Sequence, residues 1–127
     1  MNVVDSSGWL EYLADGPNAK FFAAAVENAG DLLVPTLSLY EVFKRVLQQR
    51  NEDQALQTVA LMQQGRVVEL NAAVALAAAK VGITHRLPLA DSVMLATARA
   101  HGAVFWTQDA DFENIADVRY VAKIRGR

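Results

Sequence analysis

The sequence predicts an α/β fold built on a central parallel sheet, and three observations carry that prediction. Short runs rich in valine and leucine alternate with longer stretches of helical period, as strands do when crossover helices separate them. The three prolines, Pro17, Pro35 and Pro88, stand at plausible element boundaries. With 127 residues, 53% of them apolar, the chain is long enough to bury a core without disulfides. We therefore expect one domain spanning residues 1–127.

Five short runs are expected to form the strands. They share a richness in valine and leucine, and turn or cap residues bound them. The runs are 2–4, 32–34, 67–70, 104–107 and 119–122.

A first helix is expected over 37–50, where five apolar residues recur at helical spacing and form a stripe that faces a core. They are Leu39, Val42, Phe43, Val46 and Leu47. Glu41 lies off this stripe. Further along, the alanine-rich segment 72–80 favours close helix packing, because small side chains let two backbones approach each other.

A further helix, expected over 89–101, is apolar on nearly every side, so we expect it to be buried nearly all round. One stripe consists of Leu89, Val93, Ala96 and Ala100, and Met94, Leu95 and Ala98 cover much of the rest. Helix ends are marked by four residues. Asn51 and Asn71 are expected as N-caps, and Gly65 and Gly102 as C′ glycines.

Charge and cysteine content narrow the classes of function. The formal net charge of −2 argues against a protein that grips nucleic acid through a broad basic surface. The absence of cysteine removes thiol catalysis and thiolate metal sites and fits a reducing compartment, so we expect a cytoplasmic protein. A membrane span is not expected, because the longest apolar run, 72–79, is too short to cross a membrane. Export is not expected either, because Asp5 interrupts the apolar residues near the N-terminus that a secretory signal would need. A basic C-terminal run is expected to be a solvated terminus: Arg119, Lys123, Arg125 and Arg127.

Four acids stand where a parallel sheet would bring them together. Asp5 and Asp109 follow strands, Asp91 opens the apolar helix, and Glu41 lies early in the helix after Pro35. The functional crevice of such sheets lies beyond the carboxyl ends of the strands. Each acid also has a structural explanation. An aspartate is favoured at helix N-caps and in first turns, and Glu41 could pair with Lys44 or Arg45 on the helix surface.

Convergence of these carboxylates would require protons or a cation. Two of them about 4 Å apart repel by roughly 4 kcal/mol at an effective dielectric near 20. Oxygen ligands without cysteine or a histidine cluster favour Mg²⁺ or Mn²⁺ over Zn²⁺, and such a site suits phosphoryl chemistry. Ser6 and Thr107 could orient ligands or water there, or could make ordinary turn hydrogen bonds.

Other catalytic templates are missing from the sequence. It has no glycine-rich dinucleotide loop, P-loop lysine, H-E-x-x-H or G-x-S-x-G motif. His101 is interpreted as a helix C-terminal cation and His85 as an exposed loop residue. A phospho-acceptor receiver domain would need an acidic pair after the first strand, where Ser6 and Ser7 follow Asp5. A dehalogenase-type phosphatase would need a second aspartate at the position of Ser7.

Four motifs follow one another along the chain: N-V-V-D-S at 2–6, Glu41 after Pro35, P-L-A-D-S at 88–92 running into A-T-A at 96–98, and T-Q-D-A-D-F at 107–112. Together they resemble a PIN domain, and more narrowly the VapC-type toxins of toxin–antitoxin pairs. The resemblance covers essentially the whole chain. It implies a three-layer Rossmann-like fold, in which helices flank a five-stranded parallel sheet, and a Mg²⁺- or Mn²⁺-dependent endoribonuclease that leaves 5′-phosphate and 3′-hydroxyl ends.

The resemblance also implies residue roles and partners. Asp5, Glu41, Asp91 and Asp109 would form the catalytic and metal-binding quartet, with Ser6, Thr107 and Asp111 as helpers, and Asp111 could equally be a turn or cap residue. An antitoxin segment would lie in an apolar groove. Trp9, Leu10, Tyr12, Leu13 and Phe43 could line this groove or belong to the core. A homodimer is common in the family. The alternatives are a PIN fold that serves mainly to bind proteins, and a PIN nuclease that is not a toxin.

Overall fold

Five parallel strands form the sheet of this computed structural model, which describes residues 1–125. The strands are β1 (Asn2–Val4), β2 (Leu32–Pro35), β3 (Arg66–Val68), β4 (Val104–Thr107) and β5 (Val118–Tyr120), in the order β3-β2-β1-β4-β5. The first strand is therefore central, with β2 and β4 as its parallel neighbours. This arrangement confirms the predicted fold class.

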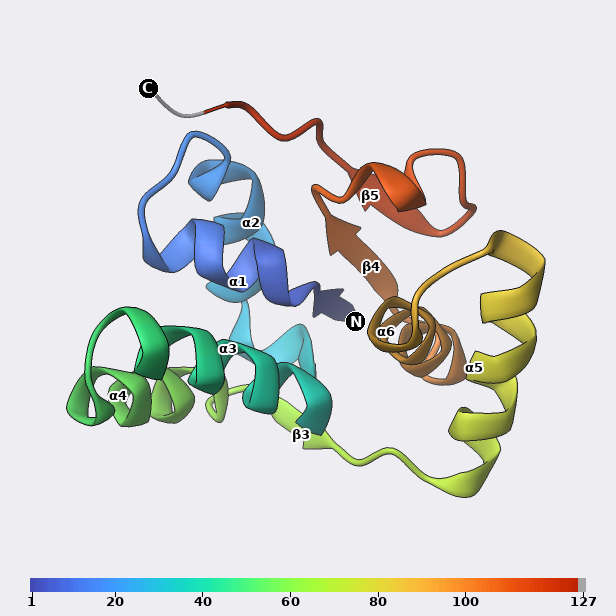
Figure 1. Cartoon of the computed structure of the whole chain (residues 1–127), viewed down its shortest axis with the longest axis horizontal. Coiled ribbons are helices and arrows are strands. Elements are labelled where there is room, and N and C mark those ends of the chain that lie inside the picture. Colours follow the sequence, from blue (N-terminus) through green and yellow to red (C-terminus); the bar gives the residue numbers. More distant parts are fainter. Residues whose placement is uncertain (126–127) are drawn as a thin grey trace.

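In the described part of the chain, six α-helices and two short 3-10 helices connect the strands (Figure 1). The α-helices are α1 (Ser6–Leu13), α2 (Ala19–Val26), α3 (Thr36–Gln49), α4 (Glu52–Met62), α5 (Ala72–His85) and α6 (Leu89–Ala100). The 3-10 helices are η1 (Ala29–Asp31) and η2 (Ala110–Phe112). None of the helices within residues 1–125 is both long and apolar enough to cross a membrane.

Alternate residues of the central strands face two separate cores. Val3 and Phe105 pack with Met94 and Leu95 of α6 on one face. Their neighbours Val4 and Trp106 pack on the other face with residues of α1 to α4. Because side chains alternate along a strand, each central strand contributes to both cores, and the helices form a layer on either side of the sheet (Figure 1).

The predicted apolar stripes extend further along two helices than the core does. Val42 is buried, but Leu47 near the end of α3 is 43% exposed. The middle of α6 is buried all round, as predicted, whereas Leu89 is 82% exposed and Ala100 is exposed too. A 14-residue helix such as α3 is about 21 Å long, and a four-residue strand such as β2 only about 13 Å. The ends of the helices therefore pass beyond the sheet.

Helix ends agree with the predicted caps at three of four positions. The side chains of Asn51 and Asn71 accept hydrogen bonds from backbone amides three residues on. Gly102 has a φ of +62° directly after the last turn of α6. Gly65 is a correction, because its φ is not positive. A Cβ there would lie 3.0 Å from the carbonyl oxygen of Leu32, so glycine permits close approach to β2.

Smaller corrections concern element boundaries. The predicted strand over 67–70 is Arg66–Val68, and the last strand lies one residue earlier than predicted and is shorter. His85 is not in a loop but ends α5, where it is half-buried. Arg86 then closes that helix with a φ of +55°, a conformation that sequence reasoning assigns to glycine or asparagine.

Candidate functional site

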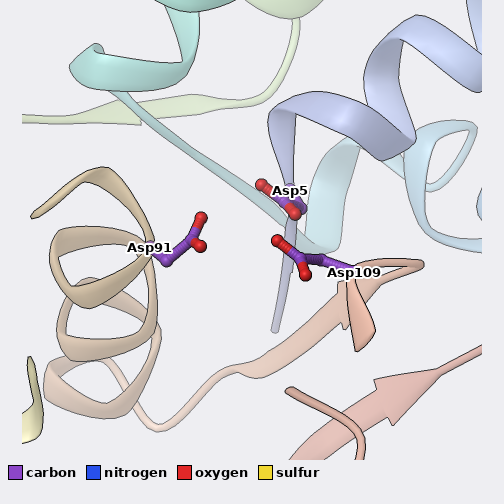
Figure 2. A group of neighbouring side chains, drawn as sticks. All are labelled: Asp5, Asp91 and Asp109. Carbon is purple, nitrogen blue, oxygen red and sulfur yellow. The ribbon is translucent and has the colours of Figure 1, made fainter. Parts of the chain in front are cut away.

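Three aspartates from distant parts of the chain meet at the carboxyl end of the sheet. Asp5 directly follows β1, Asp109 lies two residues after β4, and Asp91 is in the first turn of α6. One carboxylate oxygen from each lies within 4.8 Å of the other two. Figure 2 shows the three side chains pointing toward one another from separate elements.

The carboxylate of Asp5 is held by hydroxyl groups. It is 6% exposed and stands at the N-cap position of α1, yet its side chain makes no capping hydrogen bond. Its Oδ2 accepts hydrogen bonds from the hydroxyls of Thr107, at 2.8 Å, and Ser7, at 3.2 Å. Asp5 therefore occupies the N-cap position without the side-chain capping hydrogen bond of an ordinary helix cap.

Thr107 links Asp5 to Asp109. While its hydroxyl donates to Asp5, the same oxygen accepts from the backbone amide of Asp109 at 2.9 Å. Asp109 does cap a helix, because its Oδ1 accepts from the amide of Asp111 at the start of η2. Its carboxylate therefore serves the local turn and faces the cluster as well.

Glu41 lies in the same pocket but outside the close group of three. Its Oε1 accepts a hydrogen bond of 2.6 Å from the hydroxyl of Ser6. Both residues line a cavity of about 470 Å³ together with the three aspartates. Within residues 1–125, Glu41 forms no salt bridge with Lys44 or Arg45, so the surface ion pair considered for it is not present.

Ser7 and Asp111 differ from what the sequence suggested. The hydroxyl of Ser7 donates a hydrogen bond to Asp5, and the sequence did not predict this contact. The second serine after Asp5 was the only signal for it in the sequence. The side chain of Asp111 is exposed and is not part of the close carboxylate group, although its charge acts on Asp91.

Burial and the repulsion between carboxylates raise the pKa values of Asp5 and Asp91. Burial is the main cause that raises the pKa of Asp5 from its ordinary value of 3.8 to about 6; the hydrogen bonds from Thr107 and Ser7 oppose it. Burial also raises the pKa of Asp91 to about 7, and the charges of Asp5 and Asp109 add to it. A bound cation would remove this repulsion.

The donor set fits a hard divalent cation. All the facing groups are carboxylate oxygens, and Asp5 is already oriented by two hydroxyls. Oxygen-only sites with several negative charges favour Mg²⁺, Mn²⁺ or Ca²⁺ over softer metals.

A second cavity lies between α1, α3 and α4 and contains two of the residues that were considered for an apolar groove. Its lining is mixed: the apolar side chains include Leu10, Leu13, Val46 and Leu61, and the polar ones are Gln49, Arg50, Gln54, Gln57 and Thr58. Trp9, by contrast, is buried in the core, and the hydroxyl of Tyr12 donates to Glu27. Neither these two nor Phe43 lines this cavity. Of the five residues proposed for a groove, Leu10 and Leu13 therefore remain.

The sequence matches a known family over most of its length. A model of the PIN domain family matches residues 3–118, a span that includes all four acids. No curated protein matches the chain significantly.

Solved structures share the fold at low sequence identity. A toxin–antitoxin complex from Klebsiella pneumoniae matches with a TM-score of 0.78 and 18% identity, covering 93% of this chain and 95% of that chain. VapC20 from Mycobacterium tuberculosis, a toxin that cleaves the sarcin–ricin loop, has a TM-score of 0.74 and 16% identity, with 91% and 95% covered. FitAcB from Neisseria gonorrhoeae has a TM-score of 0.61 and 24% identity, with 94% and 96% covered.

Proposed function

The chain belongs to the PIN domain family, and from this premise we propose that it is a Mg²⁺- or Mn²⁺-dependent endoribonuclease toxin of the VapC type. The observation that carries the proposal is the meeting of Asp5, Asp91 and Asp109, whose oxygens lie within 4.8 Å of one another. PIN domains are typically nucleases, and the similar solved structures include toxins and toxin–antitoxin complexes. A cysteine-free chain that acts on RNA fits the cytoplasm.

Each residue of the quartet has a distinct structural task in phosphodiester hydrolysis. Asp5 would be the rigid ligand, because Thr107 and Ser7 fix its carboxylate. Asp91 and Asp109 would complete the cation site, and Glu41, held by Ser6, would orient a water molecule at the edge of the pocket. A bound divalent cation supplies charge neutralisation, activation of the attacking water and stabilisation of the leaving 3′-oxygen.

Two partners complete the proposal. The cavity between α1, α3 and α4 would receive an antitoxin segment, whose apolar side chains would contact Leu10, Leu13 and Leu61. A second copy of the chain would pack on α5, where Leu76 and Ile83 are 70% and 82% exposed and lie seven residues apart on one face.

The proposal is tested by RNA cleavage with matched variants. Wild type, Asp5→Asn and Asp91→Asn are incubated with a panel of cellular RNAs in Mg²⁺, in Mn²⁺ and in EDTA. We expect cleavage by wild type with either metal and none in EDTA, and a loss of at least about 100-fold in both variants. Asp117→Asn, an equal change of charge at an exposed turn residue, should cleave like wild type. Equal rates for all four proteins, or no cleavage by wild type, would contradict the assignment.

A further inference from the structure

We propose that two basic and aromatic surfaces flank the acidic pocket and guide a single strand of RNA across it. The first, the α3 flank, consists of Tyr40, Lys44 and Arg45. The second, the C-terminal flank, consists of Tyr120, Lys123 and Arg125. This inference rests on the proposed function, because it names the residues of this chain that would hold the RNA substrate of the same site.

The α3 flank presents an aromatic ring and two cations beside the carboxylates. Tyr40 is 59% exposed although it precedes Glu41 directly. The ammonium group of Lys44 lies 3.3 Å from the Tyr40 hydroxyl and 5.5 Å from the centre of its ring. Both residues and Arg45 line the cavity that holds the aspartates. An exposed ring with cations next to it is the arrangement on which an unpaired base stacks while its phosphate is neutralised.

The two cations are available for phosphate because Glu41 is engaged elsewhere. Ser6 binds its carboxylate at 2.6 Å, and the part of the chain that the structure describes contains no salt bridge from Lys44 or Arg45 to an acid. A phosphodiester that approaches the negatively charged aspartates needs such cations along its path, since the net charge of the chain is −2.

The C-terminal flank borders the acids from the other direction. A cavity of about 500 Å³ shares Ser7 and Asp109 with the acidic pocket and is otherwise lined in part by Tyr120, Lys123 and Arg125. Hydrogen bonds hold the backbone that precedes Lys123 and Arg125 in place. The amide of Val121 donates to the carbonyl of Thr107, and the buried side chain of Asn18 donates to the carbonyl of Ala122 at 3.1 Å.

Sheet order separates the two flanks and places the acids between them. The α3 helix follows β2, which lies on one side of β1, whereas the C-terminal flank begins with Tyr120 at the end of β5, beyond β4 on the other side. An RNA strand that contacts both flanks therefore passes over Asp5 and Asp109, which follow β1 and β4. The path accepts single strands, because the bases of an A-form duplex are already stacked and their faces are closed to tyrosine.

Binding is measured separately from cleavage so that the two proposals can fail independently. The probe is a fluorescein-labelled single-stranded RNA of ~12 nucleotides, within the usual range for such sites. Its affinity is followed by fluorescence anisotropy in Mg²⁺ over a range of salt concentrations. All binding variants carry Asp91→Asn to keep the RNA intact, and their counterparts with Asp91 are assayed for cleavage.

Each flank has its own expected signature. Tyr40→Ala should weaken binding about tenfold without changing the salt dependence, whereas Tyr40→Phe, which keeps the ring, should bind normally. Lys44→Gln with Arg45→Gln, and Lys123→Gln with Arg125→Gln, should each lower the slope of log affinity against log salt by about 1.4, or about 0.7 for each lost phosphate contact. Arg66→Gln with Arg99→Gln, an equal charge change at exposed residues of β3 and of the last turn of α6, should leave affinity and slope unchanged.

The outcomes distinguish the two proposals. If wild type cleaves RNA but both flank pairs bind like the charge control, the two-flank path is wrong and the nuclease assignment stands. If the flank variants lose binding as expected but wild type never cleaves, the path stands and the nuclease assignment is wrong. Equal affinity for the strand and for its duplex, or no binding at all, overturns the inference.

Discussion

At the scale of single residues, Thr107 connects two of the three aspartates of the acidic cluster. Its hydroxyl is completely buried, donates to Asp5 and accepts from the amide of Asp109. It thereby fixes the ends of two adjacent strands relative to each other. A residue that touches two candidate ligands without being one sets how well both are oriented before a cation arrives.

Replacing Thr107 with valine keeps the shape of the side chain and removes both hydrogen bonds. We expect the affinity for Mn²⁺ to fall about 10- to 100-fold and the free energy of unfolding to fall by about 1–3 kcal/mol, because buried polar groups lose their partner. Thr97→Val is the control, since that buried hydroxyl bonds only the carbonyl of Val93 within α6. Calorimetric titration with Mn²⁺ measures the affinity. An unchanged affinity in Thr107→Val would show that the Thr107 hydroxyl is not needed to position Asp5 for the cation.

Asp91→Asn should change how the stability of the metal-free protein depends on pH. Burial raises the pKa of Asp91 from 3.8 to about 7, so the native state keeps a proton that the unfolded state releases between those values. Its stability contribution is present below about pH 4 and is lost as pH rises through about 7. Asparagine carries no charge, so at pH 8 the variant should be about 1–2 kcal/mol more stable than wild type, allowing for solvent screening.

The measurement is urea unfolding in EDTA at pH 4 and at pH 8. The two proteins should have similar pH-4 stabilities apart from the constant effect of the amide, and they should diverge as pH rises. Asp117→Asn, at an exposed position, should follow wild type throughout. Parallel pH profiles for Asp91→Asn and wild type would mean that Asp91 carries no buried charge in the metal-free protein.

Residue types predicted which acids meet, but not how each one is held. Asp5, Asp91 and Asp109 stand at strand ends and at a helix start, and parallel topology brings these points to one edge. The hydroxyl donors could not be assigned in the same way. Ser6 turns to Glu41 and Ser7 to Asp5, and that choice depends on side-chain directions in the first turn of α1, which periodicity does not contain.

At the scale of elements, the short length of the strands explains which helical residues were correctly predicted to be buried and which were not. Apolar spacing identified the buried middle of α6 because both faces of that segment are covered, by the sheet and by α5. It wrongly included Leu89 and Leu47, because spacing along one helix says nothing about where the neighbouring strand ends. The interpretation of Gly65 was wrong for a related reason: its close neighbour is Leu32 on β2, which is distant in the sequence.

The contact between α1 and α2 depends on a glycine. A Cβ at Gly8 would lie 2.5 Å from Cε1 of Phe22, whose ring is fully buried. Gly8→Ala should therefore destabilise the protein by about 1–3 kcal/mol through overpacking, although alanine favours helices. Gly30→Ala meets no atom within 4 Å and should be nearly neutral. Urea unfolding of both variants checks this, and a Gly8→Ala protein as stable as wild type would show that α2 moves freely.

At the scale of the whole molecule, the exposed apolar face of α5 predicts self-association. Ile83 is 82% exposed on this helix, and Ile83→Lys places a charge where a second copy would bury it. Wild type should have the mass of a dimer by light scattering, and Ile83→Lys that of a monomer. Leu56→Lys, on an α4 side chain that is 53% exposed, should leave the mass unchanged. A monomeric wild type, or a variant with wild-type mass, would remove α5 as the interface.

Cation binding links the acidic pocket to the stability of the entire fold, because the three aspartates come from residues 5, 91 and 109 and meet only in the native state. An ion that binds the folded chain alone should raise the free energy of unfolding by about 2.7 kcal/mol at 100 times its dissociation constant. Mn²⁺ should therefore raise the melting temperature of wild type and of Asp117→Asn, while Asp5→Asn and Asp91→Asn should lose most of that increase. A rise of equal size in all four proteins would place the ion outside the carboxylate cluster. No rise in the melting temperature of wild type would mean that the carboxylate cluster does not bind Mn²⁺.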